Sequence, residues 1–179
     1  MIGFKRHSPT TEKFVEKETG SASVEFVILF PIVFMFLIAS FELGMLNLRH
    51  TMLERAVDLT VRDLRLGNIP SPSQENLRVA ICSRAGILPD CLNNLMIELR
   101  PISKSTWALP SPNAQCVDRD SEITPVTTVN AGAPDELMLV RACAVLDPLL
   151  PTTGLGAAIN RTGTGEIFLV SSSVFVNEP

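Results

Sequence analysis

The residues with the clearest chemical potential form a short junction, Gly20-Ser21-Ala22-Ser23-Val24-Glu25-Phe26, in front of an apolar stretch. Gly20 has no side chain, so a protease can approach its backbone closely, although a loop glycine before a helix is the simpler interpretation. Glu25 places a carboxylate at the edge of an apolar segment, where a charge is costly and usually has a functional partner. The alternative role for Glu25 is to complement the positive end of a helix dipole from the first turn.

Four cysteines offer a second kind of chemistry, and all of them follow the apolar stretch: Cys82, Cys91, Cys116 and Cys143. An even number on one side indicates an oxidising compartment, which places the C-terminal part outside the cytoplasm. Four cysteines permit three pairings. We favour Cys82 with Cys91 and Cys116 with Cys143, because local closure is simple. A metal site is the alternative, but the sequence has no CxxC pair and neither histidine lies near the cysteines.

The remaining residues do not assemble a catalytic or phosphate-binding motif. The Gly154-Leu155-Gly156 turn lacks the further glycines and the basic residue of a phosphate loop. Ser171 to Ser173 have no histidine base nearby in the sequence. Lys plus Arg is 15 against 19 Asp plus Glu, with no cationic cluster, which argues against nucleic-acid binding. We therefore expect no enzyme activity, no cofactor and no bound metal.

The element that must position the junction is the apolar stretch, Phe26 to Phe41, sixteen residues without a charge. Sixteen helical residues rise about 24 Å, short of a hydrocarbon core of about 30 Å, whereas residues 26–48 rise about 34 Å and fit one span. A removable signal peptide is the main alternative. Signal peptidase needs small residues after the apolar core, and here Ser21 to Ser23 lie before it, which disfavours this alternative.

The charges that flank the span do not determine its orientation, so the orientation is inferred from the cysteines. Lys and Arg number four before it (Lys5, Arg6, Lys13, Lys17) and four after it (Arg49, Arg55, Arg62, Arg65). Beyond the span, apolar residues at spacings near three and four predict that the helix continues to Leu66, half in lipid and half projecting outward. Gly67 to Pro70 should stop it. Pro31 should bend the membrane half.

The rest of the chain predicts a small domain of short elements. Ser73 is a candidate N-cap for a helix over residues 74–84. Apolar runs then predict strands at residues 95–99, 123–129, 136–146 and 166–176. The expected fold class is α+β: a long N-terminal helix that spans the membrane and projects from it, followed by a small disulfide-stitched domain with an antiparallel sheet.

The junction and the charged leader before it resemble the processing site of type IV prepilins. The opening GxxxVEF pattern at Gly20 to Phe26 is similar to that of TadE-like proteins (TadE or TadF), the minor pseudopilins of the tight-adherence (Tad, type IVc) pilus. The C-terminal run from Leu137 to Val145, the Asp147 to Pro151 turn and the terminal strand ending in Asn177-Glu178-Pro179 resemble the closing hairpin of the same family. The larger TadG type is disfavoured because its extra domain does not fit in 179 residues.

The resemblance implies three parts: a cytoplasmic leader at residues 1–20, a long helix at 21–66, and a periplasmic domain at 67–179. It implies cleavage by prepilin peptidase between Gly20 and Ser21, and an ion pair between Glu25 and an α-amino group, either that of Ser21 or that of a neighbouring subunit. Phe26 is the aromatic residue of the motif. The implied partners are prepilin peptidase, other Tad pilins and pseudopilins, the assembly platform and the lipid bilayer of the bacterial inner membrane. The alternative is an anchored periplasmic binding module that is never cut.

Overall fold

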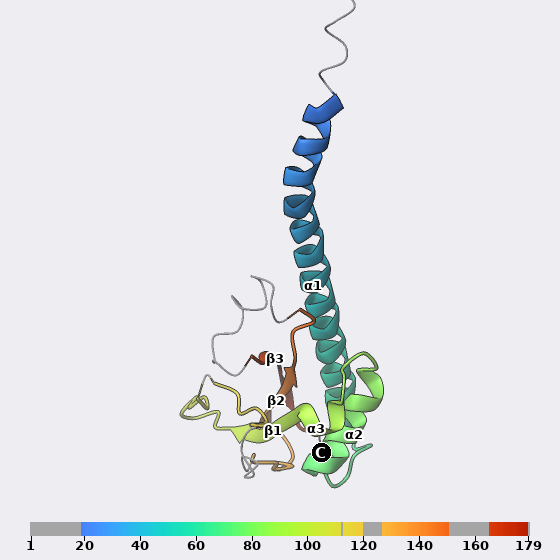
Figure 1. Cartoon of the computed structure of the whole chain (residues 1–179). Coiled ribbons are helices and arrows are strands. Elements are labelled where there is room, and N and C mark those ends of the chain that lie inside the picture. The colour runs from blue at the N-terminus through green and yellow to red at the C-terminus, as the bar shows by residue number, and fades with distance from the viewer. Residues whose placement is uncertain (1–18, 112, 120–126, 151–164, 179) are drawn as a thin grey trace, which may run out of the picture. The chain divides into compact units, whose positions relative to one another are not determined.

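A computed structural model of the chain describes residues 19–111, 113–119, 127–150 and 165–178 (Figure 1). The elements in chain order are α1 (Thr19–Arg65), α2 (Gln74–Arg84), α3 (Cys91–Asn94), β1 (Leu95–Ile102), β2 (Leu137–Leu146) and β3 (Ile167–Val176). The strands form an antiparallel sheet in the order β1-β2-β3. The predicted α+β fold class is confirmed. The chain divides into two compact units, residues 1–41 and 42–179.

The C-terminal end of α1 is a Schellman motif, formed where the sequence predicts the stop. The Asn68 N–H donates to the carbonyl of Asp63 at 2.9 Å, and the Gly67 N–H donates to that of Leu64 at 3.1 Å. Gly67 has φ of +70°, a left-handed conformation that side chains resist and glycine accepts. The last helical carbonyls therefore find donors within the chain itself.

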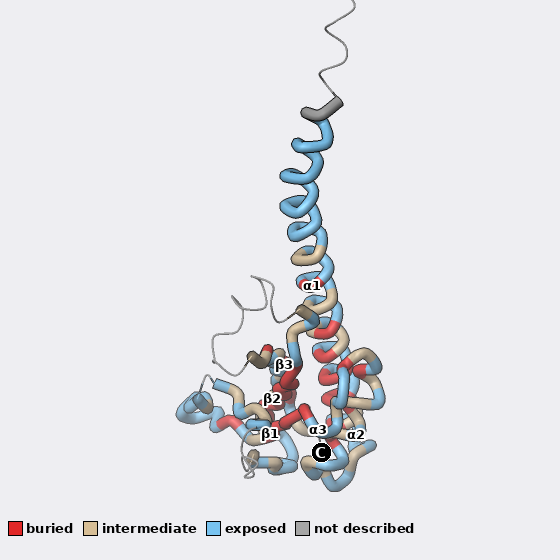
Figure 2. Tube along the Cα trace, in the orientation of Figure 1, coloured by how far each residue is buried: buried red, intermediate tan, exposed pale blue. Residues whose placement is uncertain are grey.

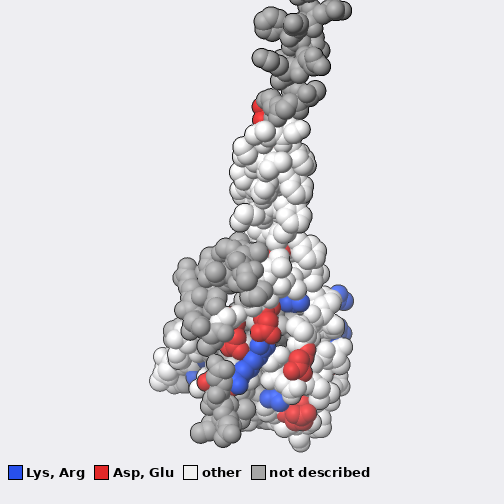
Figure 3. Space-filling view, in the orientation of Figure 1, with Lys and Arg blue, Asp and Glu red and all other residues white. Residues whose placement is uncertain are grey.

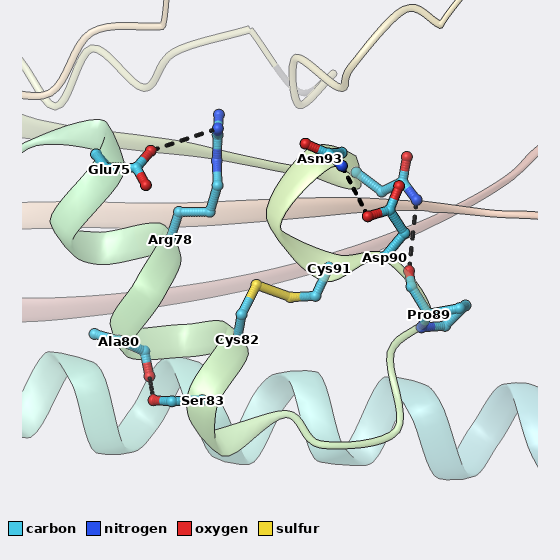
Figure 4. Close-up of a disulfide and its surroundings, with 10 residues drawn as sticks. Glu75, Arg78, Ala80, Cys82, Ser83, Pro89, Asp90, Cys91 and Asn93 are labelled. Carbon is cyan, nitrogen blue, oxygen red and sulfur yellow. Dashed lines mark hydrogen bonds and ion pairs between the residues drawn. A yellow bond between two sulfur atoms is a disulfide. The ribbon is translucent and has the colours of Figure 1, made fainter.

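The second helix begins as predicted. Ser73 has extended backbone geometry, and its hydroxyl accepts a hydrogen bond from the Asn76 N–H at 3.2 Å, as an N-cap does. The disulfide Cys82–Cys91 then joins α2 to the short α3, with 5.7 Å between the two Cα atoms (Figure 4). The disulfide closes a loop of nine residues. This is one of the two pairs favoured from the sequence.

One face of the sheet packs against the helices and forms the core of the second unit (Figure 2). The long helix supplies more of this core than the sequence analysis anticipated, because its second half buries an apolar stripe: Leu53, Ala56, Val57, Val61 and Leu64. Leu77 and Ile81 of α2 join the same cluster. The unit therefore starts at Glu42, inside α1, and residues 42–65 are part of its core.

The opposite face of the sheet is covered by loop residues held by polar links and a disulfide. The disulfide Cys116–Cys143 joins the loop that follows β1 to strand β2, across a sequence separation of 27 residues. It is the second of the pairs favoured from the sequence. On the same face, Arg141 of β2 pairs with Glu98 of β1 at 2.6 Å. Arg119 donates to the carbonyl of Val145 at 3.0 Å. The loop is thus stitched to the sheet at several points.

One predicted strand is only partly within the described residues and is not a strand there. Residues 123–126 lie outside the description, and Val129 makes a single parallel bridge to Leu99 of β1. Around this bridge the Leu99 N–H donates to the carbonyl of Thr128 at 2.9 Å, and the Asn130 N–H donates to that of Leu99 at 2.8 Å. A short extended segment therefore closes the outer edge of β1 without becoming a fourth strand.

An ion pair near the end of α1 predicts an acid-sensitive contribution to stability. The Arg84 side chain hydrogen-bonds the Asp63 carboxylate, and this bond, together with one from Asn68, holds the pKa of Asp63 below its ordinary value. An unfolded aspartate titrates near about 3.9, so the pair stabilises the fold above that pH and its contribution is lost as pH falls through the lowered pKa. We expect Asp63→Asn to lower Tm at pH 7 and to weaken the fall of Tm on acidification.

Thermal unfolding between pH 7 and pH 2 measures this effect. Asp58→Asn is the matched control, because Asp58 is an exposed aspartate on the same helix. Equal acid dependence in the Asp63→Asn variant and the parent protein would contradict the prediction.

Candidate functional site

The candidate site is the apolar stretch of α1, which belongs to the first unit and is exposed except at Ile38 and Ala39, where burial is intermediate. In Figure 2 most of this part of the helix is pale blue, and in Figure 3 its visible surface carries no Lys or Arg. Phe26 is 63% exposed and Phe36 is 70% exposed. In water such a surface would be strongly unfavourable, so it is built to be covered by lipid or by other helices.

The backbone of this stretch suits an apolar environment because a helix satisfies its own N–H and C=O groups. The helix continues through Pro31, which removes one donor, as membrane helices tolerate. The bend expected at Pro31 stays a prediction. Ser40 donates its hydroxyl hydrogen to the carbonyl of Phe36 at 2.8 Å, so its polar group is satisfied within the helix.

Three phenylalanines four residues apart stack along one side of the apolar stretch. The ring centroids of Phe26 and Phe30 are 5.2 Å apart, and those of Phe30 and Phe34 are 5.7 Å apart. These separations are those of favourable aromatic pairs. The pattern gives the helix a rigid aromatic ridge that a neighbouring helix can pack against.

The structure places Gly20 and Ser21 inside the first turns of α1, which begins at Thr19. Residues 1–18, most of the predicted leader, lie outside the described part of the chain. Glu25 is exposed and is the seventh residue of the helix, and the first turn contains no acidic residue. The macrodipole acts mainly within the first turn, so this alternative explanation of Glu25 gains no support in the uncut chain.

The helix is long and apolar enough to cross a membrane, and its most apolar 18-residue window is 0% buried in the structure. A core helix of a soluble domain would instead be buried. The N-terminal helix therefore fits a single-pass membrane anchor.

Other candidate features of the described residues are metal ligands and clefts. Within residues 19–111, 113–119, 127–150 and 165–178, no group of three or more His, Cys, Asp or Glu side chains lies close enough to hold a metal ion. A cleft of about 570 Å³ lies beside the end of β1 and the start of β2. Its lining combines Lys104, Asp135 and Glu136 with serine and apolar residues. The cleft supplies no histidine or cysteine that would act as a base or nucleophile.

A functional feature that sequence reasoning missed is the burial of Glu42. Its side chain is 1% exposed, and its carboxylate accepts a hydrogen bond from the Leu150 N–H at 3.3 Å. The signal was present in the spacing, because Glu42, Leu46, Arg49 and Leu53 lie three or four residues apart on the face that leads into the core. The carboxylate of Glu42 and the guanidinium of Arg49 interrupt this apolar stripe, so the sequence did not reveal that the stripe begins at Glu42.

Comparison with known proteins gives one family match, and it falls on α1. Residues 20–62 match the family model described as TadE-like protein. No curated protein matches the chain, and no solved structure matches it. The matched residues contain the junction and the apolar stretch, whereas the C-terminal hairpin lies beyond them. The resemblance drawn from Gly20 to Phe26 is therefore confirmed: residues 20–62 of this chain are similar to TadE-like proteins.

Proposed function

We propose that the chain is a pseudopilin-like structural component of the Tad pilus assembly machinery, cut by prepilin peptidase after Gly20 and active in fibre biogenesis and adhesion. One observation carries the proposal: the family match covers residues 20–62, and within them the apolar stretch is exposed rather than folded into the domain. A helix with that surface has its partners outside the chain.

The proposed partners of this surface are lipid and the helices of other pilin subunits. Hydrophobicity adds little to helix association inside a membrane, so van der Waals packing and polar contacts set the register. The aromatic ridge of Phe26, Phe30 and Phe34 supplies the packing surface. Glu25 supplies the charge, which pairs with the α-amino group of Ser21 or of a neighbouring subunit.

The proposed location is the bacterial inner membrane, with the leader in the cytoplasm and the domain in the periplasm. Two disulfides in the domain, Cys82–Cys91 and Cys116–Cys143, support an oxidising compartment on that side. The proposed partners are prepilin peptidase, other Tad pilins and pseudopilins, and the assembly platform. The role is structural, without catalysis, a cofactor or nucleic acid.

Intact-mass measurement and N-terminal sequencing of the membrane-extracted protein test the proposal. We expect the mature chain to begin at Ser21 and to retain the apolar stretch. A chain that begins at Met1 would support the alternative, an anchored periplasmic binding module. A mature chain without residues 26–41 would contradict both.

A substitution of Glu25 distinguishes cleavage of the leader from assembly of the fibre. We expect Glu25→Ala to be cut normally but to yield fewer pili, by about tenfold or more, because removing one partner of a buried ion pair costs about 3–5 kcal/mol. Glu54→Ala is the control, because Glu54 is a half-exposed carboxylate on the same helix, beyond the apolar stretch. Surface pili are counted by electron microscopy and by immunoblot of sheared fractions. Normal pili from Glu25→Ala would remove the case for a functional charge.

A further inference from the structure

The exposed surface of α1 stays free of charge well past the end of the apolar stretch. Between Val27 and Leu48 the only ionisable residue is Glu42, and it is 1% exposed. Leu43 and Leu48 are 43% and 48% exposed. The next cation, Arg49, is 9% exposed, so its charge is also drawn into the second unit. The exposed surface of α1 is therefore free of charge, and largely apolar apart from Asn47, for about two turns beyond Phe41.

Two polar side chains of these turns each donate a hydrogen bond within the helix. Asn47 donates its amide N–H to the carbonyl of Leu43 at 3.0 Å, and Thr51 donates its hydroxyl hydrogen to that of Asn47 at 2.9 Å. Both bonds join residues four apart, the back-bonding that lets polar side chains sit in an apolar medium.

Glu42 is shielded by a segment from the other end of the chain. Its carboxylate accepts the Leu150 N–H at 3.3 Å, so the segment 147–150, which follows β2, lies against α1 at this level. Leu149, the neighbouring residue, is 42% exposed. Glu42 lies six residues before Leu48, a rise of about 9 Å along the helix. Leu149 is thus an exposed leucine next to the residue that contacts α1 at Glu42, where the exposed surface of the helix is still uncharged.

We propose that the segment 147–150 is a membrane-contacting loop: Leu149 inserts into the lipid interface beside α1, and its backbone covers the Glu42 carboxylate. The occupant of this surface is the lipid leaflet, because the surface belongs to the same helix as the apolar stretch that fits a membrane anchor. Asp147, 75% exposed and paired with Arg119 at 2.7 Å, limits the insertion on its water side. The inference rests on the anchoring part of the proposed function.

Tryptophan fluorescence in lipid vesicles tests the insertion. The chain has one tryptophan, Trp107, so the background variant is Trp107→Phe in the full chain. Leu149→Trp is reconstituted in phosphatidylcholine and phosphatidylglycerol vesicles with lipids brominated near the headgroup or deep in the acyl chain. We expect roughly twofold quenching of Leu149→Trp by the shallow bromines, as for an indole at the interface.

Two further variants make the result decisive. Leu66→Trp is the matched control, a leucine that is 57% exposed, follows the last residue of α1 and lies about 27 Å beyond Leu48, so it should escape quenching. Leu37→Trp is the reference for the anchor and should be quenched by the deep bromines. If Leu37→Trp is quenched but Leu149→Trp behaves as Leu66→Trp does, the loop inference is overturned while the anchor stands. If Leu37→Trp is not quenched, the anchor and the inference both fail.

Discussion

Replacing Gly20 by leucine should leave residues 1–20 attached to the chain, and the mature species beginning at Ser21 should disappear. Gly20 lies in the first turn of α1, so the backbone there must open before a protease can reach the bond that follows it. Glycine favours this opening, because in a helix it is about 0.8–1.0 kcal/mol less stable than alanine. Leucine strengthens the turn and adds a side chain where the protease must approach.

The same substitution at Gly44 is the matched control. Gly44 lies in the same helix, and a Cβ atom added there meets nothing within 4 Å. Gly44→Leu should therefore be tolerated by the fold and cut as the parent is. Immunoblotting of membranes and intact-mass measurement read both variants. A Gly20→Leu chain that still begins at Ser21 would show that the cleavage site lies elsewhere or that glycine is not needed.

The elements that the sequence predicted well are those whose signals are local. The end of α1 follows from a glycine that accepts a left-handed φ at residue 67, and the start of α2 follows from the Ser73 hydroxyl. The Cys82–Cys91 disulfide joins residues only nine apart. In each of these cases the residues that determine the structure are close together in the chain.

The features that the sequence did not predict depend on distant contacts. Glu42 falls within residues 26–48, the expected span, and its buried carboxylate accepts a hydrogen bond from Leu150, 108 residues away. The apolar stripe in the second half of α1 is covered by the sheet, which forms only when β1, β2 and β3 pair, and the helix pattern alone could not name this partner. Periodicity revealed that a face would be covered, but not what would cover it.

The candidate site divides in the same way. The exposure of the apolar stretch and the position of Glu25 follow from composition and helical geometry, so the sequence was sufficient for them. The proposed cleavage after Gly20 would need a protease, and the proposed ion pair of Glu25 would need the α-amino group of a cut Ser21 or of another subunit. Neither partner exists in the uncut single chain, so the fold of one chain cannot supply these contacts.

The division of α1 into an exposed apolar half and a core half predicts that the same substitution has different consequences at two places in one helix. Leu53 is 0% exposed in the core of the second unit, whereas Leu37 is 63% exposed in the apolar stretch. Leu53→Ala removes buried methyl groups and leaves a cavity, which should destabilise the domain by about 2–5 kcal/mol. Leu37→Ala creates no cavity within the chain, so the stability of the domain should not change.

Pulse proteolysis in urea, with the protein in detergent micelles, measures this difference, because it reports the folded fraction of the domain while the micelle protects the apolar stretch. With m near about 1–3 kcal/mol/M, Leu53→Ala should lower the urea midpoint by roughly 1–3 M. Equal midpoints for Leu53→Ala and Leu37→Ala would mean that residues 42–65 do not stabilise the domain. Glu42 and Arg49 belong to the same buried stripe of α1, so that result would also count against the packing of Leu150 on Glu42, on which the proposed loop contact depends.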